Sequence, residues 1–173
     1  VEDAARKARY AWLREAAISI SAKKIALGHN LDDQSETILH RIIRGTGLRG
    51  LKGMAPIRRL SKKHDLYAVR PLIEVERFEI EAFPKDRSMK YRIDATNADV
   101  SLTRNRLRRQ LIPQIERDFN PRVKTALVKL GQTAGSFYLL VREIADEFLE
   151  NTKMLGGEDE VCLNVRQLAQ VPS

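Results

Sequence analysis

The sequence predicts an α/β fold with a parallel sheet, followed by a helical segment. A short apolar run over residues 24–29 leads into a polar turn and then an amphipathic helix, which is half of a βαβ unit. Strand and helix patterns alternate as far as residue 93, as they do in parallel sheets. From Thr103 onward, apolar residues recur mainly at helical spacing. We therefore expect a boundary that divides the chain into residues 1–112 and 113–173.

Two helices flank the first predicted strand. Asp3 is suited to cap the first helix, whose apolar stripe we expect to be buried and to include Trp12. In the second helix, Asp33 with Glu36 three residues later resembles a capping box. Gly45 is the expected end of that helix.

Apolar spacing, glycine and proline predict the later elements. Residues 44–53 contain too many glycines for a regular helix and should form a loop. Strand patterns cover residues 66–70 and 89–93, and a helix over 74–83 should end at Pro84. Helices are expected from Thr103 and from Asn120-Pro121, and a short strand over 161–165. The aromatic residues expected in the core are Tyr10, Trp12, Phe137 and Phe148.

Composition limits the partners and the compartment. The formal net charge of +8 favours a polyanionic partner, and residues 111–173, with 7 basic and 9 acidic side chains, contribute nothing to it. The single cysteine, Cys162, excludes an internal disulfide and a cysteine cluster for a metal, and is expected to be a small core residue. No apolar run approaches the roughly 20 residues that span a bilayer, so we expect no membrane partner and a cytoplasmic location.

Polar groups gather at the end of the first predicted strand, in the pattern His29-x-x-Asp32-Asp33-Gln34-x-Glu36. Open parallel sheets bind ligands outside the carboxyl ends of their strands, and a helix N-terminus at that place favours anions. Adjacent carboxylates suit Mg²⁺. A single residue of this kind is more simply a helix cap or a turn histidine, but the concentration of five favours a functional site.

A basic, glycine-rich stretch follows. It has no acidic residue and contains Arg41, Arg44, Arg49, Lys52, Arg58 and Arg59. Glycines let backbone N–H groups approach phosphate, and guanidinium groups neutralise its charge. A solvated surface loop is the simpler alternative.

A second basic group opens the predicted helix at Thr103. Arg104 and Arg108 share one face of that helix, while Leu107 turns toward the core. Such arginines can bind phosphate or offset charge at a reacting centre. Salt bridges to Asp94 and Asp99 are the structural alternative.

These motifs together resemble the tRNA(Ile)-lysidine synthetase family of the PP-loop (N-type ATP pyrophosphatase) superfamily. The resemblance covers most of the chain and rests on three blocks in this order: Gly28-His29-Asn30-Leu31-Asp32-Asp33-Gln34-Ser35-Glu36-Thr37, Arg44-Gly45-Thr46-Gly47-Leu48-Arg49-Gly50-Leu51, and Arg104-Asn105-Arg106-Leu107-Arg108. It implies an adenine nucleotide alpha hydrolase-like, Rossmann-like catalytic domain, of which residues 1–112 are the C-terminal portion. Residues 113–173 would be a helical linker and the start of a tRNA-contacting domain.

The resemblance implies a two-step reaction on an isoleucine tRNA with a CAU anticodon. ATP adenylates the C2 oxygen of the wobble cytidine and releases pyrophosphate, and the L-lysine ε-amine then displaces AMP to give lysidine. ATP and Mg²⁺ are the implied cofactors. A homodimer is left open.

The family's functional residues carry over by position. The implied catalytic residues are Asp33, Glu36, Arg104 and Arg108. The implied nucleotide-binding residues are His29, Asp32, Asp33, Arg44, Gly45 and Gly47, with Asp32 and Asp33 also on the metal. The implied tRNA contacts are Arg41, Arg49, Lys52, Asn105 and Arg109.

The chain also departs from the family pattern. Asn30 and Arg109 stand where histidine is common, and the Ser-Gly-Gly-x-Asp-Ser pyrophosphate loop is absent from these residues. We expect that loop before Val1, and expect these residues alone to be inactive. Two alternatives are a PP-loop tRNA thiolase, which commonly needs more cysteines, and a non-catalytic RNA-binding module, which would not explain the acidic cluster.

Overall fold

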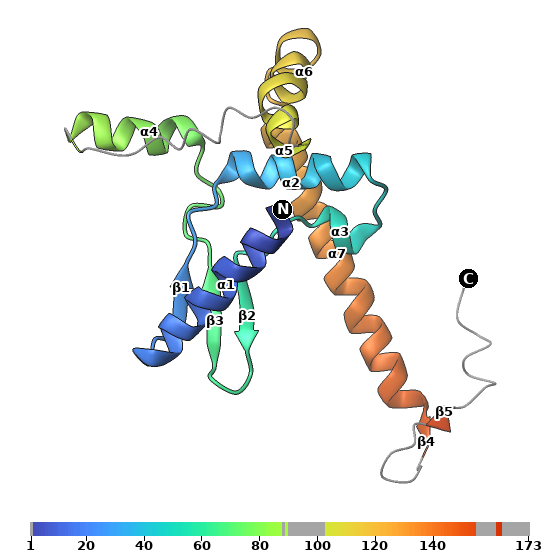
Figure 1. Ribbon diagram of the computed structural model, residues 1–173. Helices are drawn as coiled ribbons and strands as arrows, with labels where there is room; N and C mark the ends of the chain where they lie inside the picture. Colours follow the sequence, from blue (N-terminus) through green and yellow to red (C-terminus); the bar gives the residue numbers. More distant parts are fainter. Residues whose placement is uncertain (1, 88, 90–102, 155–161, 164–173) are drawn as a thin grey trace.

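The computed structural model describes residues 2–87, 89, 103–154 and 162–163 (Figure 1). The strands are β1 (Lys24–Ala26), β2 (Ile57–Ser61), β3 (Leu66–Val69), β4 (Lys153–Met154) and β5 (Cys162–Leu163). The helices are α1 (Glu2–Ser19), α2 (Leu31–Ile43), α3 (Leu48–Leu51), α4 (Arg77–Asp86), α5 (Thr103–Arg106), the π-helix η2 (Leu107–Leu111), α6 (Ile112–Asp118) and α7 (Val123–Thr152).

The main sheet contains the expected parallel pair and one strand that the sequence did not reveal. Its order is β1-β3-β2, with β1 parallel to β3 and β2 antiparallel to β3. β2 has the sequence Ile-Arg-Arg-Leu-Ser, which lacks the apolar run of a buried strand, and its ladder with β3 shifts register between Arg59 and Ser61. Tertiary pairing, and not its own pattern, makes this segment a strand.

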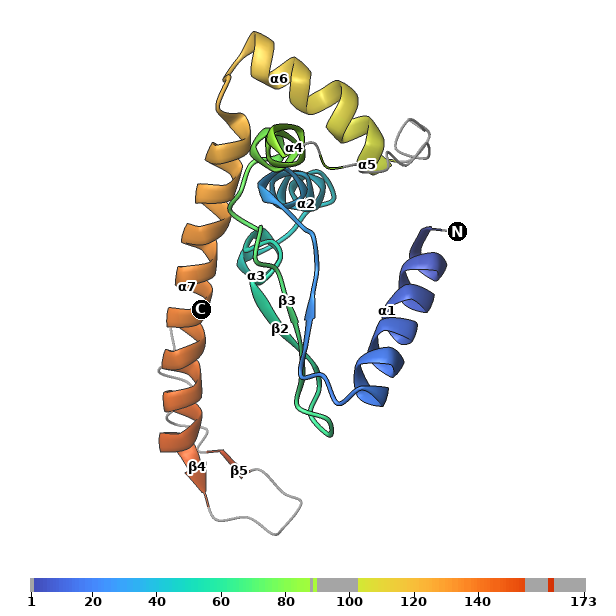
Figure 2. The same ribbon diagram turned by 90° about the vertical axis from the view of Figure 1, so that its left-hand side faces the viewer.

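Helices lie on both sides of this sheet. Figure 2 shows α1 on one side and α7 on the other, and Figure 1 shows α2 running across the end of the sheet where β1 stops. Among the described residues, the buried apolar side chains are Ala17, Leu31, Ile38, Met54, Leu66, Ala68, Ile73, Leu107, Ile112, Val128 and Ala134. The core therefore joins α2, the sheet and the first half of α7.

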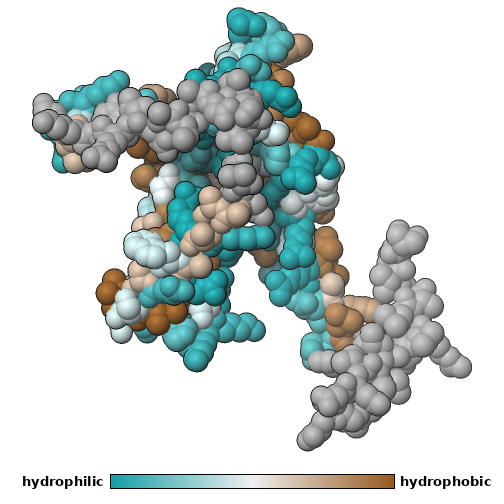
Figure 3. Space-filling view, in the orientation of Figure 1, coloured by the Kyte–Doolittle hydropathy of each residue, from teal (hydrophilic) through white to brown (hydrophobic). Residues whose placement is uncertain are grey.

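The expected burial of α1 and of two aromatic residues is wrong. Trp12 is 65% exposed and Phe137 is 56% exposed, whereas Tyr10 and Phe148 are half-buried. α1 packs mainly against β1, and the second half of α7 extends beyond the sheet, so neither has a partner on every apolar face (Figures 1 and 2). In the space-filling view, hydrophobic residues are accordingly visible on the surface along α7 (Figure 3).

The helix caps differ from the expected ones. Asp3 lies inside α1 and so is not its cap. In α2 the N-cap is Asn30: the Asp33 N–H donates to Asn30 Oδ1 at 3.0 Å, and the Asn30 N–H donates to Asp33 Oδ2 at 3.2 Å. Asp33 is thus the far member of the capping box, which leaves Glu36 free for another role. At the other end α2 stops as expected, because Gly45 follows its C-cap with φ +77°.

Two further boundaries differ from the sequence prediction. The glycine-rich stretch contains a single helical turn, α3, although Gly50 lies within it. Helix α4 continues through Pro84 to Asp86, and the Pro84 carbonyl accepts a hydrogen bond from the Met89 N–H at 2.8 Å. A proline near the last turn disrupts few helical hydrogen bonds, so it does not end α4.

The helical second part is confirmed: α7 is 30 residues long, and its last residue, Thr152, lies beyond Phe148. Leu107 is buried, as expected from its place in the pattern. α7 packs closely on α2 and α3 through Gly131, where an added Cβ would lie 2.6 Å from Ile38 Cδ1 and 3.0 Å from the Leu51 carbonyl oxygen. The expected strand over residues 89–93, Asp94 and Asp99, and the side chain of Cys162 lie outside the described part of the chain.

Candidate functional site

Two carboxylates on α2 meet two arginines from a segment far along the chain. Arg108 donates from Nε to Glu36 Oε1 at 2.5 Å and from Nη2 to Glu36 Oε2 at 3.0 Å, and its Nη2 also reaches Asp33 Oδ1 at 2.9 Å. Arg104 donates from Nε to Glu36 Oε2 at 3.2 Å, and its Nη2 lies 3.6 Å from Asp33 Oδ1. The four residues predicted as catalytic therefore form one cluster, which we call the four-residue cluster.

Local helix geometry brings these side chains together. Asp33 and Glu36 are three residues apart in the first turns of α2, so they share one face. Arg104 and Arg108 are four residues apart and also share a face, although α5 passes into the π-helix η2 between them. Single π-helical turns inside longer helices are frequent at functional sites.

The electrostatics of the cluster are those of a nearly buried ion pair. The Glu36 side chain is only 2% exposed. Burial lowers the pKa of Arg108, but its hydrogen bond to Glu36 and the negative charges of Glu36, Asp33 and Asp32 outweigh it, so the pKa lies above its ordinary value. Among the described residues, Arg104 Nη2 is buried and makes no hydrogen bond, and its contact with Asp33 Oδ1 at 3.6 Å is an ion pair only.

Asp32 belongs to a second, neighbouring group. Its Oδ1 accepts from Lys124 Nζ at 2.9 Å, and its Oδ2 accepts from the backbone N–H of Arg77, the first residue of α4, at 2.9 Å. Lys124 Nζ also lies 3.2 Å from Glu116 Oε1. Burial raises the pKa of Asp32, but the Lys124 hydrogen bond, the Arg77 N–H and both cationic charges bring it below its ordinary value.

The two aspartates do not fit Mg²⁺ as they lie. All four of their carboxylate oxygens accept from protein donors: Lys124 and the Arg77 N–H at Asp32, Arg108 and the Asn30 N–H at Asp33. Within the described residues, no group of three or more His, Cys, Asp or Glu side chains is arranged to hold a metal ion. Because Mg²⁺ at these residues would have to displace a paired cation, magnesium binding by Asp32 and Asp33 stays a prediction.

The predicted nucleotide-binding residues lie at two places. Gly28 and His29 border a cavity of about 320 Å³ between α1 and the end of β1, together with Arg9, Tyr10, Leu13 and Leu27. Arg44, Gly45 and Gly47 lie beyond the C-terminal end of α2, whereas Asp32 and Asp33 are in its first turn. The length of α2, roughly 18 Å at 1.5 Å per residue, therefore separates the two aspartates from Arg44 and the two glycines.

The predicted tRNA-contacting residues have different surroundings. Arg41 is half-buried and donates to the carbonyls of Gly50 at 2.7 Å and Gly53 at 2.8 Å, so it supports the glycine-rich stretch. Lys52 Nζ lies 4.4 Å from the centroid of the Tyr138 ring on α7. Arg49 and Arg109 are exposed, and Asn105 is half-buried beside Arg104.

The sequence comparisons decide the family. Residues 1–115 match the family model described as the PP-loop domain. The chain belongs to the PP-loop domain family.

Two curated relatives of this chain share one name. The chain is 46% identical over 131 residues to a tRNA(Ile)-lysidine synthase of Clostridium acetobutylicum, which covers 76% of the chain and 27% of that protein. It is 35% identical over 172 residues to one of Geobacter sulfurreducens, covering 99% of the chain and 35% of that protein. The expected resemblance is thereby confirmed, and the chain spans about a third of the length of these relatives.

A solved structure shares the fold of the PP-loop domain. The U34-tRNA thiolase of Methanococcus maripaludis, solved with its [4Fe-4S] cluster, matches 75% of this chain and 42% of its own with a TM-score of 0.57 and 19% sequence identity. At that identity the likeness concerns the fold alone.

None of the helices in the described part of the chain combines the length and the apolar character that a membrane-spanning segment needs.

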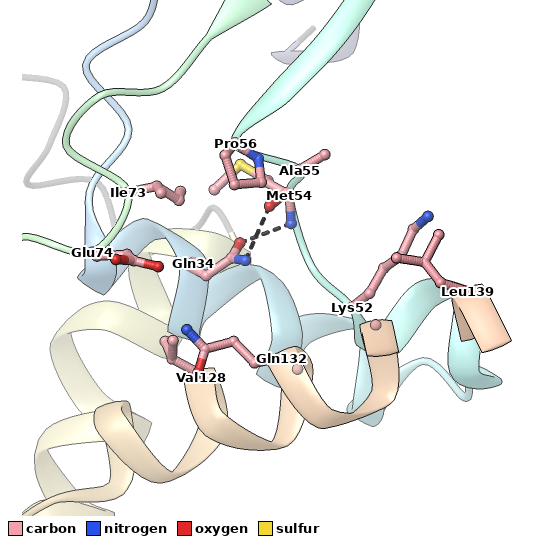
Figure 4. A pocket seen from close by; sticks show the side chains of 12 residues that line it. Gln34, Lys52, Met54, Ala55, Pro56, Ile73, Glu74, Val128, Gln132 and Leu139 are labelled. Atoms are coloured by element: carbon pink, nitrogen blue, oxygen red, sulfur yellow. Dashed lines mark hydrogen bonds between the residues drawn. The ribbon is translucent and has the colours of Figure 1, made fainter. Parts of the chain in front are cut away.

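The chain has a second cavity where α7 passes α2 (Figure 4). Its volume is about 300 Å³, and Met54, Pro56, Ile73 and Val128 give it a mostly apolar lining. Gln34 spans one wall, donating from Nε2 to the Met54 carbonyl at 3.1 Å and accepting from the Met54 N–H at 2.8 Å. Because both polar ends of this amide are satisfied by backbone, Gln34 has a structural role.

Sequence reasoning missed Lys124 and Glu116, which contact the predicted site. Both lie in the helical second part, and no local motif distinguishes them from other charged residues on amphipathic helices. Asn30 could have been found, because Asn30-x-x-Asp33 before an apolar helix fits a capping box.

Proposed function

We propose that this chain is part of an ATP-dependent tRNA-modifying enzyme that converts the wobble cytidine of an isoleucine tRNA with a CAU anticodon to lysidine. The name shared by the relatives supports the substrate, and the PP-loop domain supports the use of ATP. In the first step the C2 oxygen of the base attacks the α-phosphorus of ATP, and the bond to pyrophosphate breaks. In the second step the lysine ε-nitrogen bonds to C2, the C2–O bond breaks to release AMP, and the amine loses a proton.

The four-residue cluster is the observation that carries this proposal. The reaction brings together a polyanion, ATP, and a cation, the lysine ammonium group, and the cluster offers both complementary charges. Arg104, whose Nη2 lacks a hydrogen-bond partner among the described residues, would donate to phosphate oxygens. Arg108 would stabilise charge on the leaving group, as fixed guanidinium groups do in phosphoryl chemistry.

Asp33 and Glu36 would bind the lysine side chain. Their carboxylates attract the ammonium group, and one of them can accept the proton that the amine must lose to attack C2. In the structure each carboxylate already pairs with an arginine. Phosphate oxygens that draw the arginines away would free the carboxylates for lysine, so binding of ATP would favour binding of lysine.

The remaining predicted residues would serve ATP and tRNA. The cavity beside His29 would take part of the nucleotide, because it lies where β1 ends, at the ligand-binding edge of a parallel sheet. Exposed Arg49, with its basic neighbours, would contact tRNA phosphates. Residues 1–112 would form the catalytic portion, and residues 113–173 a helical linker into a tRNA-contacting region.

Lysine incorporation by the protein in its full natural length tests the proposal. Purified protein, ATP and radiolabelled lysine are incubated with a tRNA bearing a CAU anticodon, and a matched tRNA bearing a UAU anticodon is the control. We expect lysine to enter the CAU tRNA only, and ATP–pyrophosphate exchange to require that tRNA. Equal labelling of both tRNAs would contradict recognition of the wobble cytidine, and tRNA binding without turnover would support an RNA-binding module instead.

Variants then connect the activity to the cluster. Arg108→Lys keeps the charge but loses the two-point contact to Glu36, so we expect kcat to fall by about a hundredfold. Arg106→Lys is the matched control, because Arg106 lies between Arg104 and Arg108 in the chain but is exposed and outside the cluster. Equal activity of the two variants would place the chemistry elsewhere.

A further inference from the structure

Lys124 joins the helical second part of the chain to the start of α2. It lies in the first turn of α7, and its Nζ is 2.9 Å from Asp32 Oδ1 and 3.2 Å from Glu116 Oε1 on α6. Asp32 also accepts the Arg77 N–H from the first turn of α4. One ammonium group and one carboxylate thus connect four helices.

The surroundings of Lys124 favour its charged form. Burial lowers the pKa of Lys124, but its hydrogen bonds to Asp32 and Glu116 and their negative charges outweigh this, so the pKa lies above its ordinary value. The side chains of Lys124 and Glu116 are each 30% exposed and that of Asp32 is 14% exposed, which makes the pairs less screened than those on an open surface.

The two partners of Lys124 belong to opposite sides of the four-residue cluster. Asp32 is adjacent in the chain to Asp33 and precedes Glu36 by one helical turn, so it moves with the carboxylates. Glu116 lies on α6, which continues directly from the π-helix η2 that carries Arg108. A bond from Lys124 to each partner therefore fixes the carboxylate side relative to the arginine side.

We propose that Lys124 is a positioning residue of this site, holding Asp32 and Glu116 at once and so setting the distance between the α2 carboxylates and the α5–η2 arginines. The proposal rests on the proposed function and extends it, because α7 then contributes to the chemical step as well as linking to a tRNA-contacting region. A misplacement of about 1 Å in an active site can lower a rate by about a hundredfold. A contact outside the reacting atoms can therefore control kcat.

Three variants of the full-length protein test this role. Lys124→Met removes the charge at similar length, Lys124→Arg keeps it, and Lys129→Met removes an exposed charge from the same helix as a control. For lysine incorporation we expect Lys124→Met to lower kcat by about tenfold or more, with the KM for tRNA within about twofold of the parent. Lys124→Arg should recover most of kcat, and Lys129→Met should match the parent.

A double-mutant cycle tests whether Lys124 acts through Asp32. If it does, Asp32→Asn combined with Lys124→Met should have about the same kcat as the poorer single variant, because each removes the same ion pair. Glu116→Gln should also lower kcat, by a smaller factor than Lys124→Met does. If Lys124→Met does not fold, Lys124→Arg and Glu116→Gln carry the test through their kcat values.

Several results would overturn the proposal. The first is an unchanged kcat in Lys124→Met. The second is an effect of Lys124→Met confined to the KM for tRNA, which would make Lys124 a tRNA contact. The third is a double variant in which the effects of Asp32→Asn and Lys124→Met on kcat multiply, as they do for independent residues. If the parent protein incorporates no lysine, the proposed function fails separately, and ATP binding measured by calorimetry decides the positioning role. Weaker binding in Lys124→Met with recovery in Lys124→Arg supports it, and equal binding in all variants rejects it.

Discussion

Glu36 and Arg108 are 72 positions apart in the sequence and form a two-point ion pair, with Nε to Oε1 at 2.5 Å and Nη2 to Oε2 at 3.0 Å. The planar guanidinium group matches the two carboxylate oxygens, a geometry that a lysine ammonium cannot reproduce. Since the Glu36 side chain is 2% exposed, its negative charge depends on Arg108 and Arg104 for compensation. The pair therefore fixes α2 against the α5–η2 segment and holds the charges that the proposed reaction uses.

Removing Arg108 should destabilise the fold. Arg108→Ala leaves the buried Glu36 carboxylate with only the longer hydrogen bond from Arg104, so we expect the free energy of unfolding to fall by about 2–4 kcal/mol. Urea unfolding measures it, with Arg106→Ala as the exposed control expected within about 0.5 kcal/mol of the parent. Equal destabilisation of the two variants would show that the ion pair contributes little.

Asp33 should separate stability from activity. Asp33→Asn keeps an oxygen that can accept the Asn30 N–H but loses the ion pair with Arg108, so we expect kcat to fall by about a hundredfold or more while stability changes by about 1 kcal/mol. Asp33→Ala removes both interactions and should be the less stable variant. Thermal unfolding and lysine incorporation check this, and an Asn variant with full activity would contradict the proposed role of Asp33.

The two glycines of α7 should respond oppositely to alanine. At Gly131 a Cβ would lie 2.6 Å from the buried Ile38 Cδ1 and 3.0 Å from a backbone carbonyl, so Gly131→Ala should destabilise by about 1–3 kcal/mol. At Gly135 the nearest atom is Lys52 Cβ at 3.4 Å, so Gly135→Ala should gain up to about 1 kcal/mol from its helix propensity. Denaturant midpoints compare the two, and equal midpoints would mean that α7 can move away from α2.

The Asp32–Lys124 pair should contribute to stability in a pH-dependent way. Because the pKa of Asp32 is lowered in the folded state, its contribution is fully present above the unfolded-state pKa of about 4 and is lost as the pH falls through the folded-state pKa. Asp32→Asn should therefore be less stable than the parent at pH 7, by about 1–2 kcal/mol after allowing for solvent screening, and the difference should shrink toward pH 3. Urea unfolding at pH 7, 5 and 3 measures the difference. A constant difference would show that the carboxylate charge is not involved.

Arg49 should affect tRNA binding and little else. It is exposed on α3, so Arg49→Ala should raise the KM for tRNA, leave the KM for ATP unchanged and lower the salt slope of binding by about 1 for each phosphate that Arg49 neutralises. Arg41→Ala is an informative comparison, because Arg41 bonds to the carbonyls of Gly50 and Gly53 and its removal should lower stability as well. An unchanged salt slope in Arg49→Ala would exclude an interaction of Arg49 with tRNA phosphate.

Local patterns predicted the elements whose signal lies within their own residues. The parallel strand β1, the helix α2 and the long α7 follow from apolar runs and helical spacing, and their types were predicted correctly. β2 was missed because Ile57–Ser61 becomes a strand only by pairing with β3. The expected burial of Trp12 is wrong, because periodicity identifies an apolar face but does not tell whether another element covers it.

The sequence by itself determined the charged residues of the site and their order. It also placed Asp33 with Glu36, and Arg104 with Arg108, on shared helical faces, because helical spacing alone sets which neighbours align. Only the tertiary structure decided that these two faces meet, that Asp32 pairs with Lys124, and that Arg44 and the glycines lie at the opposite end of α2. The reason is physical: an ion pair between residues about 70 positions apart depends on how helices pack, and no local spacing carries that information.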